Sequence, residues 1–274
     1  MAQTPLPDSG RMHYVQAGQG TPPIAFVHGF ACTHSDWQPQ IGYFAKTNAV
    51  VACDLRGHGE TPGDAHDCSI ETYGADVAAL LGELKSPPAI LVGHSMGCRA
   101  VLQAYLYAPE RVAAVVLIDG SRLGFGDPVV AERVMNEQLR ATGYGVFARR
   151  LFDEMFVVSS DPKLKATLME RALQLRSEIG GTLFPRMVGW DARRMEAALA
   201  AVRVPLMVIQ STTMSAERIR VSLSSSQTSP WLDLVKSRAP TARVEIVTGV
   251  GHFPQLEAPA KVNALLADFA SKLA

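Results

Sequence analysis

Residues 93–97 read Gly-His-Ser-Met-Gly, and their types and spacing are suited to chemistry. An apolar, strand-like run precedes them at 89–92, and a helix-like run follows at 98–105. A sharp turn between a strand and a helix holds a serine in a strained conformation and exposes its hydroxyl, while the glycines let neighbouring backbone pass closely. The N-terminus of the following helix stabilises negative charge. The pattern therefore predicts that Ser95 is a nucleophile.

A serine nucleophile needs a base to take its proton. Of the seven histidines, only His252 follows Ser95 in the chain. It lies in the segment Gly-Val-Gly-His-Phe-Pro at 249–254, directly after a strand-like run at 243–247. Loops at the carboxyl ends of strands carry ligand-facing residues in open α/β sheets. We therefore expect His252 to be the base.

A tetrahedral oxyanion needs two backbone N–H donors. We expect one from Met96, the residue after the nucleophile, and one from Phe30, in the loop after an apolar run at 24–27. The residues expected to line the substrate pocket are His28, Trp37, Leu123 and Phe125.

Short apolar runs alternate with helical patterns along most of the chain. The expected strands are 12–15, 24–27, 49–53, 89–92, 112–118, 206–209 and 243–247, and the expected helices are 70–84, 97–107, 231–238 and 258–273. Several strands are apolar throughout, which is typical of strands buried on both faces. This succession predicts an α/β fold with a mostly parallel central sheet flanked by helices.

The alternation breaks once, between Gly120 and Arg203. The stretch has only helical patterning, at 129–142, 146–156, 164–179 and 193–201. We expect it to be an inserted helical cap or lid over residues 121–202, which divides an α/β core formed by 1–120 and 203–274. Such a lid would exclude water and shape the pocket. The alternative is a set of ordinary helices without a gating role.

Composition and charge indicate which partners and which compartment to expect. The 274 residues include 26 Lys and Arg and 26 Asp and Glu, so formal charge is zero and favours neither nucleic acid nor an anionic membrane as a partner. Residues 1–10 lack the pattern of a signal peptide, and no apolar run approaches the roughly 20 residues that span a bilayer. The four cysteines form no CxxC pair, which favours free thiols in a cytoplasmic protein without a metal or other cofactor.

Four motifs follow one another at characteristic spacing: His-Gly-Phe at 28–30, Asp-Leu-Arg-Gly-His-Gly at 54–59, the serine motif at 93–97, and Gly-His-Phe-Pro at 251–254. Together they resemble the α/β-hydrolase fold superfamily, and the resemblance covers about 12–273. It implies the fold of that family and a Ser, acid, His triad. It defines function less closely, because the family includes esterases, lactonases, carbon–carbon hydrolases, haloperoxidases, lyases and cofactor-free dioxygenases.

The acid departs from the family's usual pattern. Relatives usually carry it just after the first strand beyond the lid, but residues 208–217 contain no Asp, and Glu217 lies late in that segment. Asp119 ends the expected strand 112–118, next to the nucleophile strand, and resembles the acid of certain lactonases and dioxygenases. We expect Asp119 to be the acid; Glu217 and Asp233 are the alternatives, and Asp119 could instead cap the first turn of the lid.

These residues favour a serine hydrolase of carboxylic esters or lactones, of which acyl-homoserine lactones are one class implied by the resemblance. A cofactor-free dioxygenase that uses a His–Asp pair on an aromatic hydroxyl is the alternative, and a non-catalytic receptor for a small ligand is another. The Ser- and Thr-rich segment 211–229 reads as an exposed loop, and its Arg218 and Arg220 read as solvated charges rather than as partners of a substrate carboxylate.

Overall fold

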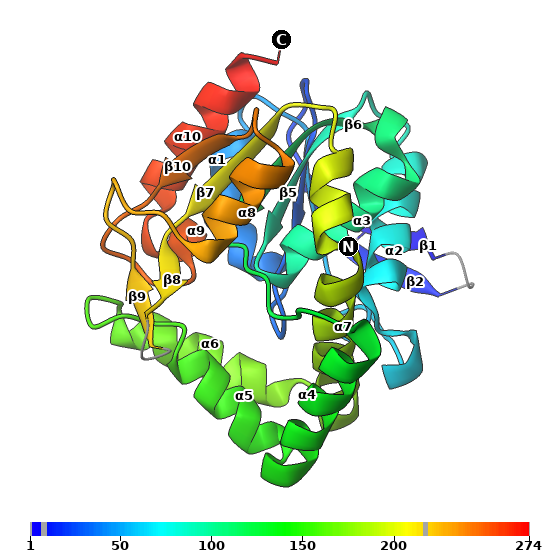
Figure 1. The fold of residues 1–274 in the computed structure, drawn as a ribbon. Coiled ribbons are helices and arrows are strands. Elements are labelled where there is room, and N and C mark those ends of the chain that lie inside the picture. Colours follow the sequence, from blue (N-terminus) through cyan, green and yellow to red (C-terminus); the bar gives the residue numbers. More distant parts are fainter. Residues whose placement is uncertain (1, 7–9, 216–218, 274) are drawn as a thin grey trace.

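The computed structural model describes residues 2–6, 10–215 and 219–273. Its centre is an eight-stranded sheet with the order β1-β2-β4-β3-β5-β6-β7-β10 (Figure 1). Strand β2 is antiparallel to β1 and β4, whereas the other neighbouring strands are parallel. The strands are β1 (Ala2–Pro5), β2 (Arg11–Ala17), β3 (Ile24–Val27), β4 (Val50–Cys53), β5 (Ala89–His94), β6 (Val112–Ile118), β7 (Leu206–Gln210) and β10 (Arg243–Ile246). The predicted fold class, a mostly parallel sheet flanked by helices, is confirmed.

Helices cover both faces of this sheet. They are α1 (Gln38–Phe44), α2 (Ile70–Glu83), α3 (Met96–Tyr107), α8 (Pro230–Arg238), α9 (Pro254–Glu257) and α10 (Pro259–Ser271), with short 3-10 helices at His34–Trp37, Ala65–Asp67 and Pro109–Arg111. Successive residues of β3 enter opposite cores: Ala25 and Val27 pack in the larger apolar cluster, and Ile24 and Phe26 pack in the smaller one. Strands buried on both faces in this way explain the uninterrupted apolar runs in the sequence.

Four helices separate β6 from β7. They are α4 (Pro128–Thr142), α5 (Tyr144–Asp153), α6 (Pro162–Gln174) and α7 (Ser177–Ala201), and we refer to them as the cap. Helices α4, α5 and α6 lie beyond one end of the sheet, and α7 continues from them along the core, where it contacts α3 and α8 (Figure 1). Helix α7 is longer than the expected 193–201, because its buried residues Leu183 and Trp190 outweigh the helix-breaking tendency of Gly180 and Pro185.

A buried ion pair ties the cap to the core. Arg99 of α3 donates from Nε and Nη2 to the two carboxylate oxygens of Asp191 of α7, at 2.7 and 2.6 Å, and both side chains are buried. The same arginine donates to the backbone oxygens of Ser95 and Ser121, and Asp191 accepts from the N–H of Leu123. The ion pair therefore joins the turn after β5, the segment after β6 and the longest cap helix.

The segment 211–229 differs from the exposed loop expected. It contains a two-stranded antiparallel sheet of β8 (Thr212–Met214) and β9 (Arg220–Ser222). Ser211 and Thr212 are buried, and Ser229 caps the N-terminus of α8. Residues 216–218 lie outside the described part of the chain. In the described ranges, none of the helices is both long and apolar enough to cross a membrane.

Candidate active site

The turn between β5 and α3 holds Ser95 with φ 53° and ψ −113°. Its two glycines are required by close backbone approaches. A Cβ on Gly93 would lie 2.3 Å from the oxygen of Gly97, and a Cβ on Gly97 would lie 2.3 Å from the oxygen of Val27. The strand–turn–helix arrangement expected from the sequence is therefore present, and it leaves Ser95 partly exposed between buried neighbours.

Ser95, His252 and Asp119 form one chain of hydrogen bonds. His252 Nε2 lies 2.8 Å from Ser95 Oγ, and His252 Nδ1 lies 2.6 Å from Asp119 Oδ2. The histidine and the carboxylate are buried. The structure thus brings together the three residues that the sequence singled out as nucleophile, base and acid, although they come from loops after three different strands.

Asp119 directly follows β6 in a left-handed conformation, with φ 43°. Its Oδ1 accepts the backbone N–H groups of Ser211 at 2.7 Å and Thr212 at 2.9 Å, and its Oδ2 accepts the Thr212 hydroxyl at 2.6 Å. Ser211 is the first residue after β7. The segment in which relatives usually carry the acid therefore supplies donors that hold Asp119.

Of the two alternative acids, the structure describes Asp233. Asp233 is exposed on α8 and accepts the hydroxyl of Thr228 at 2.6 Å. Glu217 lies outside the described residues.

The surroundings favour a charged Asp119 beside a neutral His252. Burial opposes ionisation of Asp119, but the hydrogen bond and charge of His252 and the charge of Arg220 outweigh it and lower the pKa of Asp119 to about 2. Burial and then the charge of Arg220 lower the pKa of His252 below its usual 6.5, although Asp119 acts in the opposite direction. A neutral imidazole can accept the proton of Ser95.

Arg220 of β9 is the charged residue that sequence reasoning missed. Its Nη1 donates to Thr212 Oγ1 at 2.7 Å and lies 3.4 Å from His252 Nδ1 and 3.8 Å from Asp119 Oδ2. Only 16% of its side chain is exposed, so the expectation of a solvated charge is wrong. The β8–β9 hairpin that turns it inward was not expected from the sequence. Arg218 lies outside the described residues.

His94, the second residue of the serine motif, supports the loop that carries His252. Its Nε2 donates to the backbone oxygen of His252 at 2.7 Å. Burial and then the charge of His252 lower the pKa of His94 to about 3, so its ring is neutral. It therefore positions His252 without exchanging protons itself.

The loop after β3 passes against the serine turn. Strands β3 and β5 are parallel neighbours, and a Cβ on Gly29 would lie 3.2 Å from Ser95 Cβ. Phe30 follows in this loop, and Met96 begins α3 on the other side of Ser95. Their N–H groups stay the candidates for an oxyanion hole.

Two of the four expected pocket residues lie elsewhere. Trp37 is fully buried in the smaller core cluster, stacked on Phe26 at 4.8 Å. His28 is also fully buried; its Nδ1 donates to Gly29 O at 2.7 Å, and its Nε2 accepts from Leu55 N at 3.0 Å. The expectation that these two side chains line the substrate pocket is wrong, because one fills the core and the other joins two loops.

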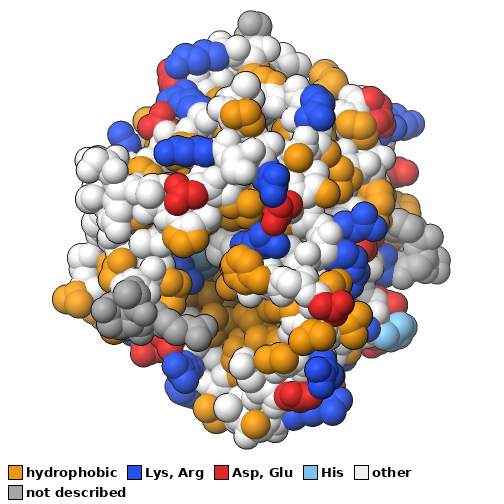
Figure 2. Space-filling model, viewed as in Figure 1, with side chains coloured by type: hydrophobic (Ala, Val, Ile, Leu, Met, Phe, Trp, Pro, Cys, Tyr) orange, Lys and Arg blue, Asp and Glu red, His pale blue; other side chains and the backbone are white. Residues whose placement is uncertain are grey.

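Leu123 and Phe125 do line a cavity, of about 700 Å³, where the segment after β6 meets α5, β8, β9 and α8. We call it the cleft. Figure 2 shows this face of the molecule hollowed between core and cap, with hydrophobic side chains inside the hollow. Its apolar lining residues are Leu123, Phe125, Leu151, Met214, Pro230, Trp231 and Leu234. Ser95, His252 and Asp119 are not among the residues that line the cleft, but Arg220 is, and its Nη1 lies 3.4 Å from His252 Nδ1.

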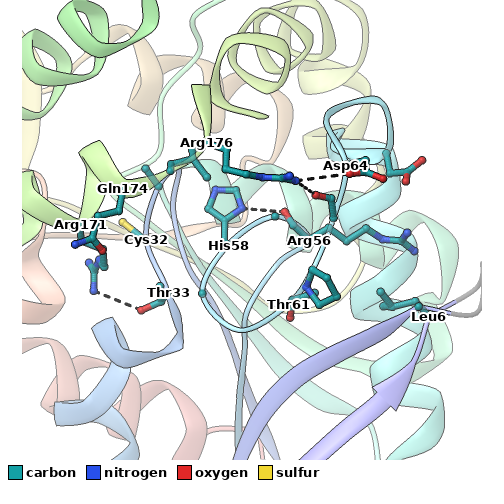
Figure 3. Close-up of a pocket in the computed structure, with 18 residues that line it drawn as sticks. Leu6, Cys32, Thr33, Arg56, His58, Thr61, Asp64, Arg171, Gln174 and Arg176 are labelled. Atoms are coloured by element: carbon teal, nitrogen blue, oxygen red, sulfur yellow. Dashed lines mark hydrogen bonds and ion pairs between the residues drawn. The ribbon is translucent and has the colours of Figure 1, made fainter. Parts of the chain in front are cut away.

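A second cavity, of about 760 Å³, lies where α6 and the start of α7 meet the loops after β3 and β4 (Figure 3). Two cap arginines reach core residues at this boundary: Arg171 Nη1 lies 3.4 Å from Thr33 Oγ1, and Arg176 Nη2 lies 3.7 Å from an oxygen of Asp64. Ser95, His252 and Asp119 are not among its lining residues. Contacts from Arg171 and Arg176 thus cross the boundary between the cap and the core at this cavity.

One buried cluster has donor types that could hold a metal ion. His13, His34 and Asp54 place their ligand atoms within 4.8 Å of one another. Both imidazoles lie 3.0 Å from Asp54, which also accepts the N–H groups of His34 and Glu60. Asp54, in the loop after β4, therefore joins His13 of β2 and His34 of the 3-10 helix His34–Trp37 by hydrogen bonds.

Two curated proteins are similar to this chain in sequence. Over 265 residues the chain is 27% identical to the dihydrolipoyllysine-residue acetyltransferase component of the acetoin cleaving system of Cupriavidus necator, covering 94% of this chain and 66% of that protein. It is 24% identical over 304 residues to bifunctional epoxide hydrolase 2 of Sus scrofa, covering 94% of this chain and 53% of that protein. The chain thus spans about half to two thirds of the length of these relatives.

A solved structure of a thermophilic esterase from Thermogutta terrifontis superimposes with a TM-score of 0.82 at 20% identity, covering 99% of this chain and 98% of the esterase. At that identity the likeness concerns the fold. The family model described as "Alpha/beta hydrolase family" matches residues 24–265. With this match over most of its length, the chain belongs to the alpha/beta hydrolase family.

Proposed function

We propose that this protein is a serine hydrolase that cleaves carboxylic esters, including lactones. The observation that carries the proposal is the unbroken chain of hydrogen bonds from Ser95 Oγ through His252 to Asp119, at 2.8 and 2.6 Å. Such a chain lets a hydroxyl lose its proton to a neutral imidazole while it attacks a carbonyl carbon.

The reaction proceeds in two halves. His252 Nε2 takes the proton of Ser95 as Oγ bonds to the ester carbonyl carbon, and the N–H groups of Phe30 and Met96 receive the negative oxygen. The carbon–oxygen bond to the alcohol then breaks, and His252 returns the proton to the departing oxygen. Water, deprotonated by His252, attacks the acyl-serine and releases the acid, with the proton returning to Ser95.

Asp119 stays ionised throughout. Its hydrogen bond to Nδ1 fixes the tautomer in which Nε2 is free to accept, and its charge stabilises the imidazolium. Burial alone would oppose the ionised form, but the hydrogen bond and charge of His252, followed by the charge of Arg220 and the hydroxyl of Thr212, outweigh burial and lower the pKa of Asp119.

A serine nucleophile also favours esters over epoxides, the substrates named for one relative. Attack of Ser95 on an epoxide would give an ether, which water does not readily release. Attack on a carbonyl gives an acyl-serine ester, which water hydrolyses with the same base. The Ser95–His252 pair therefore completes a catalytic cycle on carboxylic esters and not on epoxides.

The substrate is a small molecule of moderate apolar character. The cleft that Arg220 connects to His252 has a volume of about 700 Å³, a size typical of small-ligand sites, and its lining combines apolar side chains with polar and charged ones. Lactones are cyclic esters and follow the same steps, and acyl-homoserine lactones are one class to include in a screen.

Steady-state hydrolysis of p-nitrophenyl esters of increasing chain length, and of acyl-homoserine lactones, tests the proposal in the wild type and Ser95→Ala. We expect turnover of at least one series and its loss in the variant. An inert wild type that consumes oxygen with an aromatic hydroxy compound would instead support the dioxygenase alternative.

A further inference from the structure

The backbone that carries His252 is held from two sides. On its carbonyl side, His94 Nε2 donates to His252 O at 2.7 Å, and Ser211 Oγ lies 2.7 Å from Gly251 O, so both partners come from the core. On its N–H side, the three consecutive N–H groups of Gly251, His252 and Phe253 find acceptors in α9 and in the cap. All three residues are buried, so each of these N–H groups needs an acceptor.

Glu257, the last residue of α9, supplies two of these acceptors. Its Oε2 accepts the N–H of Gly251 at 3.0 Å, and its Oε1 accepts the N–H of Phe253 at 3.2 Å. One carboxylate therefore binds the residues on either side of His252. It restricts the stretch of backbone from which the imidazole extends.

The cap supplies the third acceptor. Residues 154–161 join α5 to α6, and we call them the cap loop. The N–H of His252 donates to Met155 O at 2.8 Å. The hydroxyl of Ser160 donates to Glu257 Oε2 at 2.5 Å. The cap loop thus holds His252 directly and also fixes the carboxylate that holds its two neighbours.

Close packing accompanies these hydrogen bonds. The rings of Phe156 and Phe253 are stacked, with their centroids 5.4 Å apart. A Cβ on Gly251 would lie 2.8 Å from Met155 O and 3.2 Å from Phe156 Cα, so a larger residue here would push the two segments apart. The cap loop therefore lies directly against the segment that carries His252.

The imidazole has little room for displacement. His252 Nε2 lies 2.8 Å from Ser95 Oγ, and its Nδ1 lies 2.6 Å from Asp119 Oδ2. A misplacement of about 1 Å can cost about 10²-fold in rate. The hydrogen bonds of the Glu257 carboxylate go to backbone N–H groups and to Ser160, so Glu257 influences the reaction through the placement and the surroundings of His252.

Glu257 also contributes charge beside the base. Titratable and charged groups face His252 from several elements: Asp119 after β6, Arg220 of β9, His94 at the end of β5, and Glu257 of α9. Burial and then the charge of Arg220 lower the pKa of His252, whereas Asp119 and then the charge of Glu257 act to raise it. Removing the negative charge of Glu257 should therefore lower the pKa of His252 further.

We infer that Glu257 is a positioning residue for His252 and that the cap loop, through Ser160, fixes Glu257 in this role. Core and cap then set the base together, because a cap loop that moves away removes the acceptor of the His252 N–H and the hydroxyl bound to Glu257. The inference rests on the proposed hydrolase function for its effect on rate, whereas the state of the imidazole can be measured without a substrate.

The first test separates positioning from general stability. Glu257→Gln keeps the size of the side chain, but its NH₂ group cannot accept an N–H, so one of the two backbone N–H groups loses its acceptor. We expect kcat for p-nitrophenyl esters to fall about 10- to 100-fold and KM to stay within about threefold, because a misplaced base slows the chemical steps. A Glu257→Gln protein with the wild-type melting temperature and the wild-type kcat would overturn the inference.

The pH profile gives a reading that a purely structural role would not change. In Glu257→Gln the acid limb of kcat/KM should move to lower pH, because a charge that raises the pKa of His252 is gone. Asp161→Asn is the matched control, since it changes a carboxylate to an amide at the exposed N-cap of α6, where Asn also caps well. It should leave the acid limb in place. A limb that Glu257→Gln leaves in place or moves to higher pH would contradict the inference.

Two neighbouring serines of the cap loop test its part in this arrangement. Ser160→Ala removes the hydroxyl bound to Glu257 without a change in charge, so kcat should fall about 3- to 10-fold. Ser159 donates instead to Gly249 O at 2.9 Å, and Ser159→Ala should leave kcat within about twofold of wild type. In Ser160→Ala/Glu257→Gln the two losses should be less than multiplicative, because both act through one carboxylate. Equal losses in the two serine variants would show that the cap loop does not act through Glu257.

The last measurement needs no substrate. Nitrogen NMR of the histidine rings reports the tautomer and the pKa of His252, whose signals are identified by their loss in His252→Asn. We expect the wild type to carry the proton on Nδ1, facing Asp119, and Glu257→Gln to show more of the other tautomer and a lower pKa. Asp161→Asn should match the wild type. Identical His252 signals in the wild type and Glu257→Gln would overturn the inference.

The two proposals fail in different ways. Should the wild type hydrolyse no ester while the tautomer and pKa of His252 depend on Glu257, the hydrolase proposal fails and the positioning role stands. Should the wild type hydrolyse esters while kcat, the acid limb and the His252 signals are the same in Glu257→Gln, the hydrolase proposal stands and the positioning role is refuted.

Discussion

At the scale of single residues, Asp119 departs from the family's usual position for the acid, and both oxygens of its carboxylate accept hydrogen bonds. It follows β6, and the Ser211–Thr212 pair after β7 holds it with two N–H groups and a hydroxyl. The segment after β7, in which relatives usually carry the acid, thus supplies backbone and hydroxyl donors to Asp119.

Asp119→Asn should leave the fold intact and lower kcat by about 10⁴, the loss that the same change of the triad acid causes in serine proteases. The NH₂ group of an amide cannot accept a hydrogen bond from Nδ1–H, so the substitution favours the wrong imidazole tautomer. Ester turnover and thermal unfolding of the same preparation check this. A variant with a native melting temperature and near-native kcat would show that Asp119 is not the catalytic acid.

The pH dependence follows from the surroundings of His252. Because burial and Arg220 lower its pKa, the neutral form persists below pH 6.5, so the acid limb of kcat/KM should lie below pH 6.5. Activity falls as pH drops through that pKa. Arg220→Met removes the nearby positive charge, so its acid limb should move to higher pH. A limb that stays in place, or moves lower, would contradict this assignment.

Some residues of the candidate active site could be predicted from the sequence, and others could not. Ser95 stands out by its motif, and His252 by being the only histidine after Ser95. Asp119 emerges because the usual position lacks an acid. Arg220 and His94 do not stand out, since their contacts depend on the β8–β9 hairpin and on a loop that is distant in sequence.

At the scale of elements, the buried Arg99–Asp191 pair joins α3 to α7. Asp191→Ala would leave the Arg99 guanidinium buried without its carboxylate, so we expect the free energy of unfolding to fall by about 3–5 kcal/mol. Urea unfolding of both single variants and the double variant measures it. Arg99→Ala/Asp191→Ala should be less destabilised than the sum of the two single variants. A loss below about 1 kcal/mol would mean that the pair contributes little to holding the cap.

The central strands were predictable because both of their faces are buried, which produces runs such as Ile24–Val27 and Val112–Ile118. Shorter strands carry no such pattern. Neither β1 nor the β8–β9 hairpin was expected, because their pairing depends on residues outside the strand itself. Helix α1 was missed for a related reason: it has seven residues and only two of them are buried.

At the scale of the whole molecule, the cap and the core together form the cleft, so its shape should govern which acyl chains fit. Leu151 of α5 lines the cleft opposite the core residues. Leu151→Trp should reduce kcat/KM for long-chain p-nitrophenyl esters about 10-fold and leave that for the acetate within about threefold. The chain-length profile of both proteins checks this. A uniform change across chain lengths would place the acyl chain elsewhere.

The central claim is that Ser95 forms the covalent acyl intermediate, and a fluorophosphonate probe tests it most directly. Such a probe reacts with an activated serine and stays attached, so peptide mass spectrometry locates it. We predict one phosphonate on the peptide that contains Ser95, no labelling of Ser95→Ala, and strongly slowed labelling of His252→Ala. Unlabelled wild type, or Ser95→Ala that still turns over esters at the wild-type rate, would contradict the account.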